Sequence, residues 1–197
     1  MVLSASSPGR IHLISYQSRW ADEFNQIGSR LRGGLGSLAL RIDHIGSTSV
    51  PGLAAKDIID IQVTVAALDE ELLQAMHRLG YIRSEQINYD HQPAHSPSED
   101  RDWQKWYFKP PAGGRPVHVH VRVSGRLNQR YPLLFRDYLR THPATTAAYE
   151  QLKRRLADNL PDRVIYTEVK DPAVDLIYLA AEEWAMIVHW QPGKSDA

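Results

Sequence analysis

The stretch His44-Ile-Gly-Ser-Thr-Ser-Val-Pro-Gly-Leu53 stands between two segments that have the pattern of β-strands, residues 38–45 and 58–65. A glycine followed by three hydroxyl side chains directly after a strand can present N–H and O–H donors to an anion. Gly46 lets the backbone approach a phosphate closely because it has no Cβ. A Walker P-loop is excluded, since no Gly-Lys-Ser/Thr follows at the required spacing. An ordinary Gly/Ser loop is the alternative.

The second of these strands carries a carboxylate on an otherwise apolar segment. Asp60 and Gln62 share one face, and Ile59 and Ile61 share the other. Burying a carboxylate in such a strand is costly unless something pairs with it, and a hard cation such as Mg²⁺ is one natural partner. The alternative is that Asp60 accepts hydrogen bonds from the Gly-Ser turn, or pairs with Lys56 or an arginine.

A third strand pattern, Val117-His-Val-His-Val-Arg-Val123, has an unbroken valine face and a polar face of His118, His120 and Arg122. Two imidazoles at i and i+2 can share a metal ion or shuttle protons, and Arg122 can hold a phosphate or a carboxylate with two hydrogen bonds. A solvated strand face is the alternative. If this strand neighbours the one that carries Asp60, the two polar faces converge.

Basic side chains recur on the expected C-terminal helices and can close over an anionic ligand. They are Arg136, Arg140, Lys153, Arg154 and Arg155. Ion pairing on the helix surface is the alternative, for example between Asp137 and Arg140, or between Glu150 and Lys153 or Arg154.

The sequence predicts a sheet core at residues 11–125 and a set of helices at residues 128–190. Together they predict an α/β (α+β) fold in which helices flank a mixed sheet. We expect a single domain over residues 1–197. Trp103, Trp106 and Tyr107 are interpreted as hairpin core rather than as a base-stacking platform. The first half of the sheet core is expected to contain a short strand at 11–14, a helix at 20–35 ended by Gly33, Gly34 and Gly36, and strands at 38–45 and 58–65. In the strand at 38–45, Leu38, Leu40, Ile42 and His44 share one face. The second half is expected to contain a helix at 68–79 closed by Gly80, a strand at 81–84, a polar lid or disordered segment at 85–102, and a hairpin of 103–109 and 116–123, and three helices that start near Asn128, Pro143 and Asp171 follow.

Composition excludes several classes of protein. The 197 residues contain 23 Lys+Arg and 23 Asp+Glu, so the net charge is zero, which argues against a general nucleic-acid binder or an anionic-membrane binder. Cysteine is absent, which excludes disulfides and thiolate sites and is compatible with a reducing cytosol. Residues 1–10 lack the apolar core of a signal peptide, and the acidic residues of segment 173–190 predict a packing helix rather than a membrane span. We therefore expect a cytoplasmic protein.

Several of these segments together resemble the GrpB family of nucleotidyltransferase-fold proteins, over about Tyr16 to Trp184. The residues that carry the resemblance are Asp43-His-Ile-Gly-Ser-Thr-Ser-Val-Pro-Gly-Leu-Ala-Ala-Lys56, Ile58-Ile-Asp-Ile61, His118-Val-His120, Phe135-Arg-Asp-Tyr-Leu-Arg140, Tyr149 with Lys153, and Tyr166 with Lys170. The superfamily signature is Gly-Ser, a gap of nine to thirteen residues, and then two carboxylates on one strand. In working members the resemblance implies a Gly-Ser turn that holds nucleotide phosphates, and three carboxylates that hold two Mg²⁺ ions.

This chain departs from that pattern at two positions. Gln62 stands at the second carboxylate, and His118 or His120 aligns with the third, so the carboxylate charge falls from three to one. A single metal ion, or a softer one that accepts imidazole, is the more consistent expectation. The family commonly lacks the full triad, so the fold does not establish transferase activity. Fusions of this domain to dephospho-CoA kinase hint at a nucleotide or coenzyme ligand.

The resulting hypothesis is a protein that binds a nucleotide or a similar small phosphorylated ligand with a divalent metal ion, Mg²⁺ or Mn²⁺ or alternatively a transition metal, and transfers a nucleotidyl group to an unknown acceptor. A non-catalytic nucleotide- or coenzyme-binding module and a His-metal-dependent enzyme are the alternatives. The predicted catalytic residues are Asp60, Gln62, His118 and His120, of which Asp60, His118 and His120 are metal ligands. The predicted phosphate-binding residues are Gly46, Ser47, Thr48, Ser49, Lys56, Arg136, Lys153 and Lys170. The sequence predicts no membrane partner and does not encode the oligomeric state.

Overall fold

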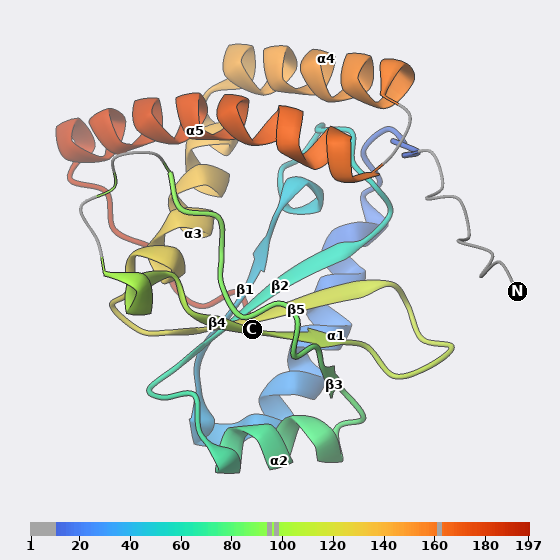
Figure 1. Cartoon of the computed structure of the whole chain (residues 1–197), viewed down its shortest axis with the longest axis vertical. Coiled ribbons are helices and arrows are strands. Elements are labelled where there is room, and N and C mark those ends of the chain that lie inside the picture. Colours follow the sequence, from blue (N-terminus) through green and yellow to red (C-terminus); the bar gives the residue numbers. More distant parts are fainter. Residues whose placement is uncertain (1–10, 94–95, 97–98, 161–162) are drawn as a thin grey trace, which may run out of the picture.

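Five strands form one mixed sheet in the order β1-β2-β5-β4-β3 (Figure 1). The computed structural model describes residues 11–93, 96, 99–160 and 163–197. The strands are β1 (Ala39–Ile45), β2 (Ile59–Val65), β3 (Ile82–Arg83), β4 (Lys105–Lys109) and β5 (Val117–Val123). β2 and β5 run parallel, whereas the other three pairs are antiparallel. The predicted mixed sheet and the predicted hairpin, which is the β4–β5 pair, are confirmed.

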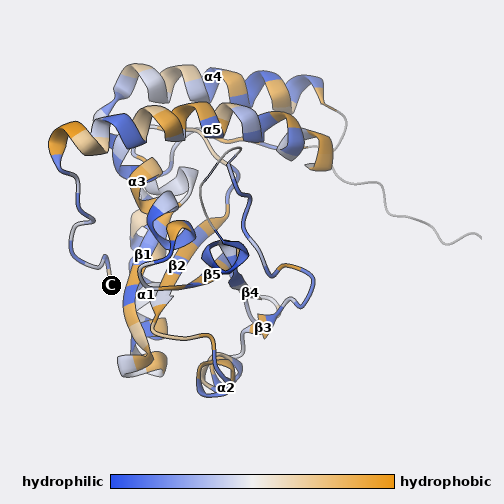
Figure 2. Ribbon diagram, turned by 60° about the vertical axis from the view of Figure 1, so that its left-hand side comes forward, coloured by the Kyte–Doolittle hydropathy of each residue, from blue (hydrophilic) through white to orange (hydrophobic). Residues whose placement is uncertain are grey.

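Helices lie on both sides of this sheet. They are α1 (Arg19–Leu35), α2 (Glu70–Arg78), α3 (Leu127–Thr141), α4 (Pro143–Asn159) and α5 (Arg163–Val188). α1 and α2 share a hydrophobic core with the strands. α3 lies toward the other side, and α4 and α5 run side by side beyond it in both views (Figures 1 and 2). This arrangement leaves the second face of the sheet turned toward the C-terminal helices.

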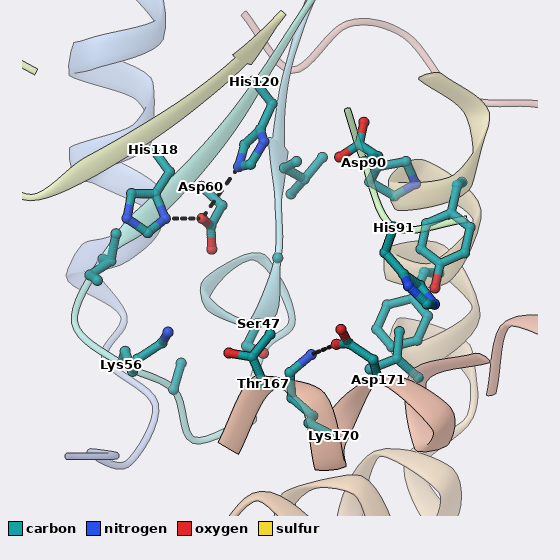
Figure 3. A pocket seen from close by; sticks show the side chains of 18 of the residues that line it. Ser47, Lys56, Asp60, Asp90, His91, His118, His120, Thr167, Lys170 and Asp171 are labelled. Atoms are coloured by element: carbon teal, nitrogen blue, oxygen red, sulfur yellow. Dashed lines mark hydrogen bonds and ion pairs between the residues drawn. The ribbon is translucent and has the colours of Figure 1, made fainter. Parts of the chain in front are cut away.

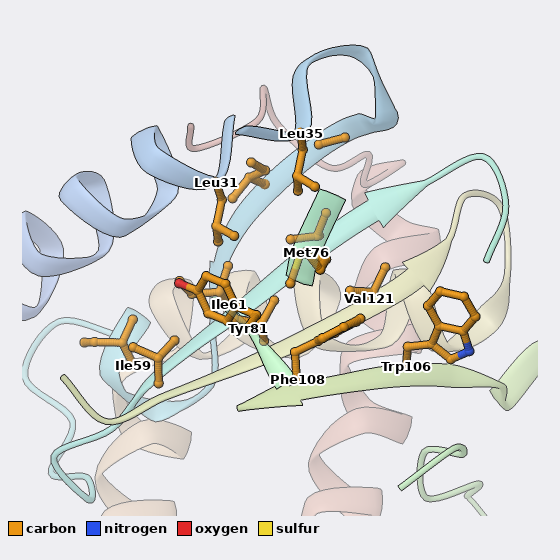
Figure 4. Close-up of a cluster of buried hydrophobic side chains, with 14 of the residues drawn as sticks. Leu31, Leu35, Ile59, Ile61, Met76, Tyr81, Trp106, Phe108 and Val121 are labelled. Atoms are coloured by element: carbon orange, nitrogen blue, oxygen red, sulfur yellow. The ribbon is translucent and has the colours of Figure 1, made fainter. Parts of the chain in front are cut away.

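The core under α1 and α2 takes every second residue of the two central strands (Figure 4). The buried strand residues are Ile59, Ile61, Val63, Val65, Val117, Val119 and Val121. Leu31 of α1 and Met76 of α2 pack against them. Each buried aliphatic side chain contributes roughly 1.5–3 kcal/mol, and a slip of one residue would move all of them to the polar face. The predicted apolar face is confirmed, so the polar residues of β2 and β5 point to the other side.

The first strands differ from the sequence prediction. The β1–β2 register shifts between Ala39 and Arg41, and such a bulge sends one residue out of the alternation. Leu40 is therefore 51% exposed while Ile42 is fully buried, so the prediction that they share a face is wrong. The strand expected at 11–14 is reduced to one bridge between Ile14 and Ala55.

The last helix also differs. We expected it to start at Asp171-Pro172, but it starts at Arg163 and Pro172 lies inside it. Proline removes one main-chain hydrogen bond, but Tyr166 before it and Tyr178 after it are both buried. Packing therefore holds the helix on both sides of the proline. Among the described residues, neither α5 nor any other helix has the length and apolar character needed to cross a membrane.

Candidate functional site

A cavity of about 330 Å³ lies between the polar face of the sheet, the loop after β1 and the helices α3, α4 and α5 (Figure 3). Its volume falls within the range of roughly 300–1,000 Å³ that is usual for small-ligand sites. The polar strand face that the alternation predicted therefore opens onto a space large enough for a small molecule.

Strand register brings Asp60 together with two histidines in this cavity. In the parallel β2–β5 pair, Asp60 is opposite His118, and Gln62 is opposite His120. His118 Nδ1 lies 3.0 Å from Asp60 Oδ1, and His120 Nε2 lies 3.9 Å from the same oxygen (Figure 3). One ligand atom from each of the three residues lies within 4.8 Å of the others. The structure thus places Asp60, His118 and His120 close enough to share one ion.

The protonation states of Asp60 and His120 suit metal binding. Burial raises the pKa of the Asp60 carboxyl, but the hydrogen bond with His118 and the nearby His120 imidazole outweigh that effect and hold the pKa well below its ordinary value. Burial lowers the pKa of His120 to about 4. Near pH 7 the carboxylate is therefore anionic and the His120 imidazole is neutral, as a metal ion requires of these ligands.

The donor set fits one metal ion rather than two. Two ligand atoms about 2.1 Å from one ion and 90° apart stand about 3.0 Å from each other, which matches the 3.0 Å between His118 Nδ1 and Asp60 Oδ1. One carboxylate and two imidazoles suit Mn²⁺, Fe²⁺ or Zn²⁺ better than paired Mg²⁺ ions, which prefer oxygen. One contact opposes the third ligand: His120 Nδ1 lies 3.4 Å from Lys105 Nζ, whereas a ligating histidine donates its second N–H to an acceptor. Asp60 and His118 therefore fit the metal better than His120 does.

Gln62 lies on the expected strand face but does not line the cavity. It is fully buried, its Oε1 accepts a hydrogen bond of 2.8 Å from Arg122, and its Nε2 donates to the main-chain oxygen of Gln129 at 2.9 Å. Gln62, which we predicted to be a catalytic residue, is therefore bonded within the protein and does not face the cavity. Arg122 does hold a carboxylate with two hydrogen bonds, each of 2.8 Å, and this carboxylate is that of Asp90.

The Gly-Ser turn lies directly against the carboxylate. Gly46 has a φ of +70°, and a Cβ at this position would fall 2.9 Å from the Cβ of Asp60 and closer still to its carboxylate. The glycine that we predicted to admit a phosphate therefore also makes room for Asp60. The following 3₁₀ turn, Ser47–Ser49, is held from behind by His44, whose Nε2 lies 3.0 Å from Thr48 Oγ1.

Three lysines line the same cavity as the turn: Lys56, Lys153 and Lys170. Lys153 is 3% exposed, and its ammonium donates to Ser47 Oγ at 3.0 Å and to the main-chain oxygen of Ala54. Burial lowers the pKa of Lys153 to about 7. Lys170 contacts Asp171 at 3.2 Å. Of the three, Lys153 contacts Ser47 directly, and Lys56 and Lys170 line the same cavity.

Two predicted phosphate ligands lie outside the cavity. Arg136 is buried, and its guanidinium donates to the main-chain oxygen of His44 at 2.9 Å and to Asp196 at 2.7 Å. Ser49 Oγ donates to the main-chain oxygen of Gly46 at 2.6 Å. The expectation that Arg136 and Ser49 contact phosphate is therefore wrong, and both side chains support the loop instead.

Several cavity residues were missed by the sequence patterns. Asp90 comes from the polar segment 85–102, where no periodic signal exists, and His95 of that segment lies outside the described residues. Asn128 and Tyr131 line the cavity from α3, and helical spacing would have grouped them. Trp103 also lines the cavity, although it is only 3% exposed, and Trp106 is part of the core under α1 and α2.

The mixed sheet with helices on both sides defines an α+β fold, with a Gly-Ser turn set against a strand carboxylate at its cavity. Comparison with known proteins gives the family. The model of the GrpB protein family matches residues 10–179, and this chain belongs to that family. The dephospho-CoA kinase of Mycobacterium tuberculosis is 38% identical over 205 residues, which cover 95% of this chain and 49% of that protein. The chain thus spans about half the length of the curated relatives it matches most strongly.

Solved structures support the fold. The crystal structure of the conserved protein GrpB from Enterococcus faecalis is 31% identical, with a TM-score of 0.68, and the match covers 88% of this chain and 99% of that one. Cid1 in complex with the UTP analogue UMPNPP is a weaker match, at 13% identity and a TM-score of 0.47 over 74% of this chain and 43% of that one.

Proposed function

We propose that this protein binds a nucleotide or a similar small phosphorylated ligand in the cavity, together with one divalent metal ion, and transfers the nucleotidyl group to an acceptor. The observation that carries this proposal is the contact between the Gly46–Ser47 turn and Asp60, which puts an anion-binding turn beside the candidate metal ligand. The name of the Mycobacterium tuberculosis relative, a dephospho-CoA kinase, supports a nucleotide or coenzyme as the ligand.

The chain's own residues supply charge and orientation for this reaction. In nucleotidyl transfer an acceptor oxygen bonds to the α-phosphorus and the bond to pyrophosphate breaks. Lys56, Lys153 and Lys170 are placed to offset the negative charge of the phosphates, and Ser47 can donate to a phosphate oxygen. Asp60 and His118, with His120 as a weaker third ligand, would hold the metal ion, which supplies Lewis-acid stabilisation of the phosphate oxygens when bound.

A non-catalytic binding module is the second candidate, and Gln62 favours it. The position of the second carboxylate is taken by an amide that is already bonded to Arg122, so only one carboxylate remains among the three positions of the superfamily signature. Such a module would bind the same ligand without turnover. A His-metal-dependent enzyme of another kind is favoured only by the nitrogen-rich donor set of Asp60, His118 and His120.

Thermal unfolding with a panel of ligands tests binding. The panel contains the four nucleoside triphosphates, CoA and dephospho-CoA, each with and without Mg²⁺, Mn²⁺ or Zn²⁺. A ligand at 100 times its Kd stabilises the protein by about 2.7 kcal/mol. We expect a shift that requires both ligand and metal and is lost in Asp60→Asn but kept in Asp22→Asn, an exposed carboxylate of α1. A shift of equal size in Asp60→Asn would refute the role of Asp60.

Turnover separates the enzyme from the module. The nucleoside triphosphate that stabilises best is incubated with the protein and metal, and pyrophosphate, the leaving group of nucleotidyl transfer, is measured. Release that disappears in Asp60→Asn supports transfer, whereas saturable binding without release supports the module. A metal that co-purifies and is lost in His118→Ala, with no nucleotide binding, would favour the third candidate.

A further inference from the structure

Four aromatic side chains form a continuous wall along one side of the cavity. Trp103, Tyr131, Phe135 and Tyr149 all line it. Each ring contacts the next, with centroid separations of 6.2 Å, 6.4 Å and 5.8 Å in that order. The metal ligands and the phosphate-site lysines do not account for this wall, which is too apolar for phosphate and suits a flat ring.

Two of the residues that line this side of the cavity, Asn128 and Tyr131, each have a buried polar atom without a partner. Among the described residues, the Oδ1 of Asn128 and the hydroxyl of Tyr131 are buried without a hydrogen bond. The orientation of the Asn128 amide is fixed, because its Nδ2 donates to two acceptors: Asp90 Oδ2 at 3.0 Å and the main-chain oxygen of Gln104 at 2.9 Å. The atom left over is therefore an acceptor that needs a donor. A buried polar atom without a hydrogen-bond partner is costly, so a bound ligand that brings a donor to Asn128 Oδ1 would remove this cost.

The position of this wall relative to the phosphate site suits an elongated ligand. Asp90 and His91 lie across the cavity from His118 and Lys56, with Ser47 and Lys170 between the two sides (Figure 3). Because Asn128 donates to Asp90, its face of α3 belongs to the side away from His118. The wall begins at the phosphate site, where Lys153 Nζ lies 4.9 Å from the Tyr149 ring, and it ends at Tyr131 and Trp103. A ligand with phosphates near Ser47 therefore has its other end at Tyr131 and Trp103.

We propose that this face of α3 is a nucleobase subsite, in which the base lies against the aromatic wall, Asn128 Oδ1 accepts an N–H of the base edge and the Tyr131 hydroxyl bonds a neighbouring base atom. This inference rests on the proposed function and names the part of the ligand that the phosphate site does not hold. Nucleobases pair a ring or amino N–H with an adjacent acceptor on one edge. Asn128 and Tyr131 lie three positions apart on α3, the spacing that puts two side chains on one helix face, and they offer an acceptor and a hydroxyl to such an edge. Burial raises the pKa of Tyr131, so the hydroxyl keeps its proton and can donate.

Tyr131→Phe tests this subsite, with Tyr178→Phe as the matched control. The Tyr178 ring lies against that of Tyr131, with 4.0 Å between the centroids, but the Tyr178 hydroxyl already donates to Glu182. Titration calorimetry in the presence of Mn²⁺ measures the affinities of ATP, CTP, GTP, UTP and the base-free probe tripolyphosphate. Thermal unfolding of the free protein gives the stability of each variant.

The two variants should respond in opposite ways. Tyr131→Phe removes an unsatisfied hydroxyl, so the free protein should melt at the same temperature or higher, while affinity for the best nucleotide falls roughly three- to tenfold and affinity for tripolyphosphate is unchanged. Tyr178→Phe should melt lower and bind both ligands as the wild type does. Phe135→Leu, which removes part of the wall, should weaken nucleotide binding alone.

Three results would overturn the inference. They are a lower melting temperature in Tyr131→Phe, wild-type nucleotide affinity in both Tyr131→Phe and Phe135→Leu, and nucleotides that bind no more tightly than tripolyphosphate. In each case binding of tripolyphosphate would leave the phosphate site standing. If neither tripolyphosphate nor any nucleotide binds, the proposed function itself fails and the subsite fails with it.

Discussion

Replacing Gly46 by alanine tests whether the turn and the Asp60 carboxylate depend on each other. Gly46 has φ +70° and ψ −175°, a conformation that costs another residue roughly 1–3 kcal/mol. The new Cβ would fall 2.9 Å from the Cβ of Asp60, so Asp60 must move and lose its contact with His118, which costs roughly 1.5–3 kcal/mol for a charged hydrogen bond. Together these effects predict a loss of about 2.5–6 kcal/mol from a free energy of unfolding on the order of 5–15 kcal/mol.

Two other glycines separate the backbone effect from the contact with Asp60. Gly52 also has a positive φ, +82°, but a Cβ there would meet no described atom within 4 Å, so Gly52→Ala should cost only the backbone strain, roughly 1–3 kcal/mol. Gly33 lies inside α1 with similar open space, and Gly33→Ala should stabilise the protein by roughly 0.5–1 kcal/mol.

Urea unfolding at 25 °C measures all three variants, and calorimetric titration with Mn²⁺ measures metal affinity. We expect Gly46→Ala to be the least stable and to lose metal affinity, while Gly52→Ala and Gly33→Ala keep the wild-type affinity. The reasoning is refuted if Gly46→Ala is as stable as Gly52→Ala and binds Mn²⁺ as tightly as the wild type does.

Three further predictions concern buried charges. Burial lowers the pKa of His44 to about 4 from its ordinary 6.5, so the unfolded chain takes up this proton at a higher pH than the folded protein does. About 3 kcal/mol of stability is therefore present above pH 6.5 and should disappear as the pH falls to 4. Urea unfolding at several pH values measures this, and the free energy of unfolding should depend less on pH in His44→Gln. Arg122→Met leaves Asp90 buried without its main partner and should cost roughly 3–5 kcal/mol of the free energy of unfolding. Arg101→Ala breaks the ion pair with Glu99, in which each side chain is 71% exposed, and should change that free energy by under about 0.5 kcal/mol. Equal effects of the two substitutions would contradict this prediction. Because burial lowers the pKa of Lys153 to about 7, the unfolded chain holds that proton to higher pH, so wild-type stability should rise between pH 7 and 10, and this rise should be smaller in Lys153→Met.

Much of the fold could be read from local patterns. The alternation of apolar and polar residues placed Ile59 and Ile61 on the opposite strand face from Asp60. This prediction held because one face of a central strand is buried under helices, which requires apolar side chains on that face. The patterns failed where packing overrode them. Leu40 left its face through a bulge that depends on pairing with β2, and Pro172 is inside a helix because residues on both sides of it are packed.

The candidate site was only partly accessible to sequence reasoning. Asp60, His118 and His120 could be grouped because each stands on the polar face of a patterned strand. Gln62 stands on the same face and was grouped with them, but Arg122 takes its side-chain oxygen. Which polar side chain is free for a ligand depends on its partners, and those partners are distant in the chain.

The sequence by itself determined which strand faces are polar, where the turn needs a glycine, and the family to which the chain belongs. These properties depend on residues within a few positions of one another, so a linear pattern contains them. Only the tertiary structure decided that Asp60 lies 3.0 Å from His118 and that Asn128 is left with an unused acceptor. Such contacts join residues dozens of positions apart, and their distances are set by the register of β2 against β5 and by the docking of α3 beside the sheet.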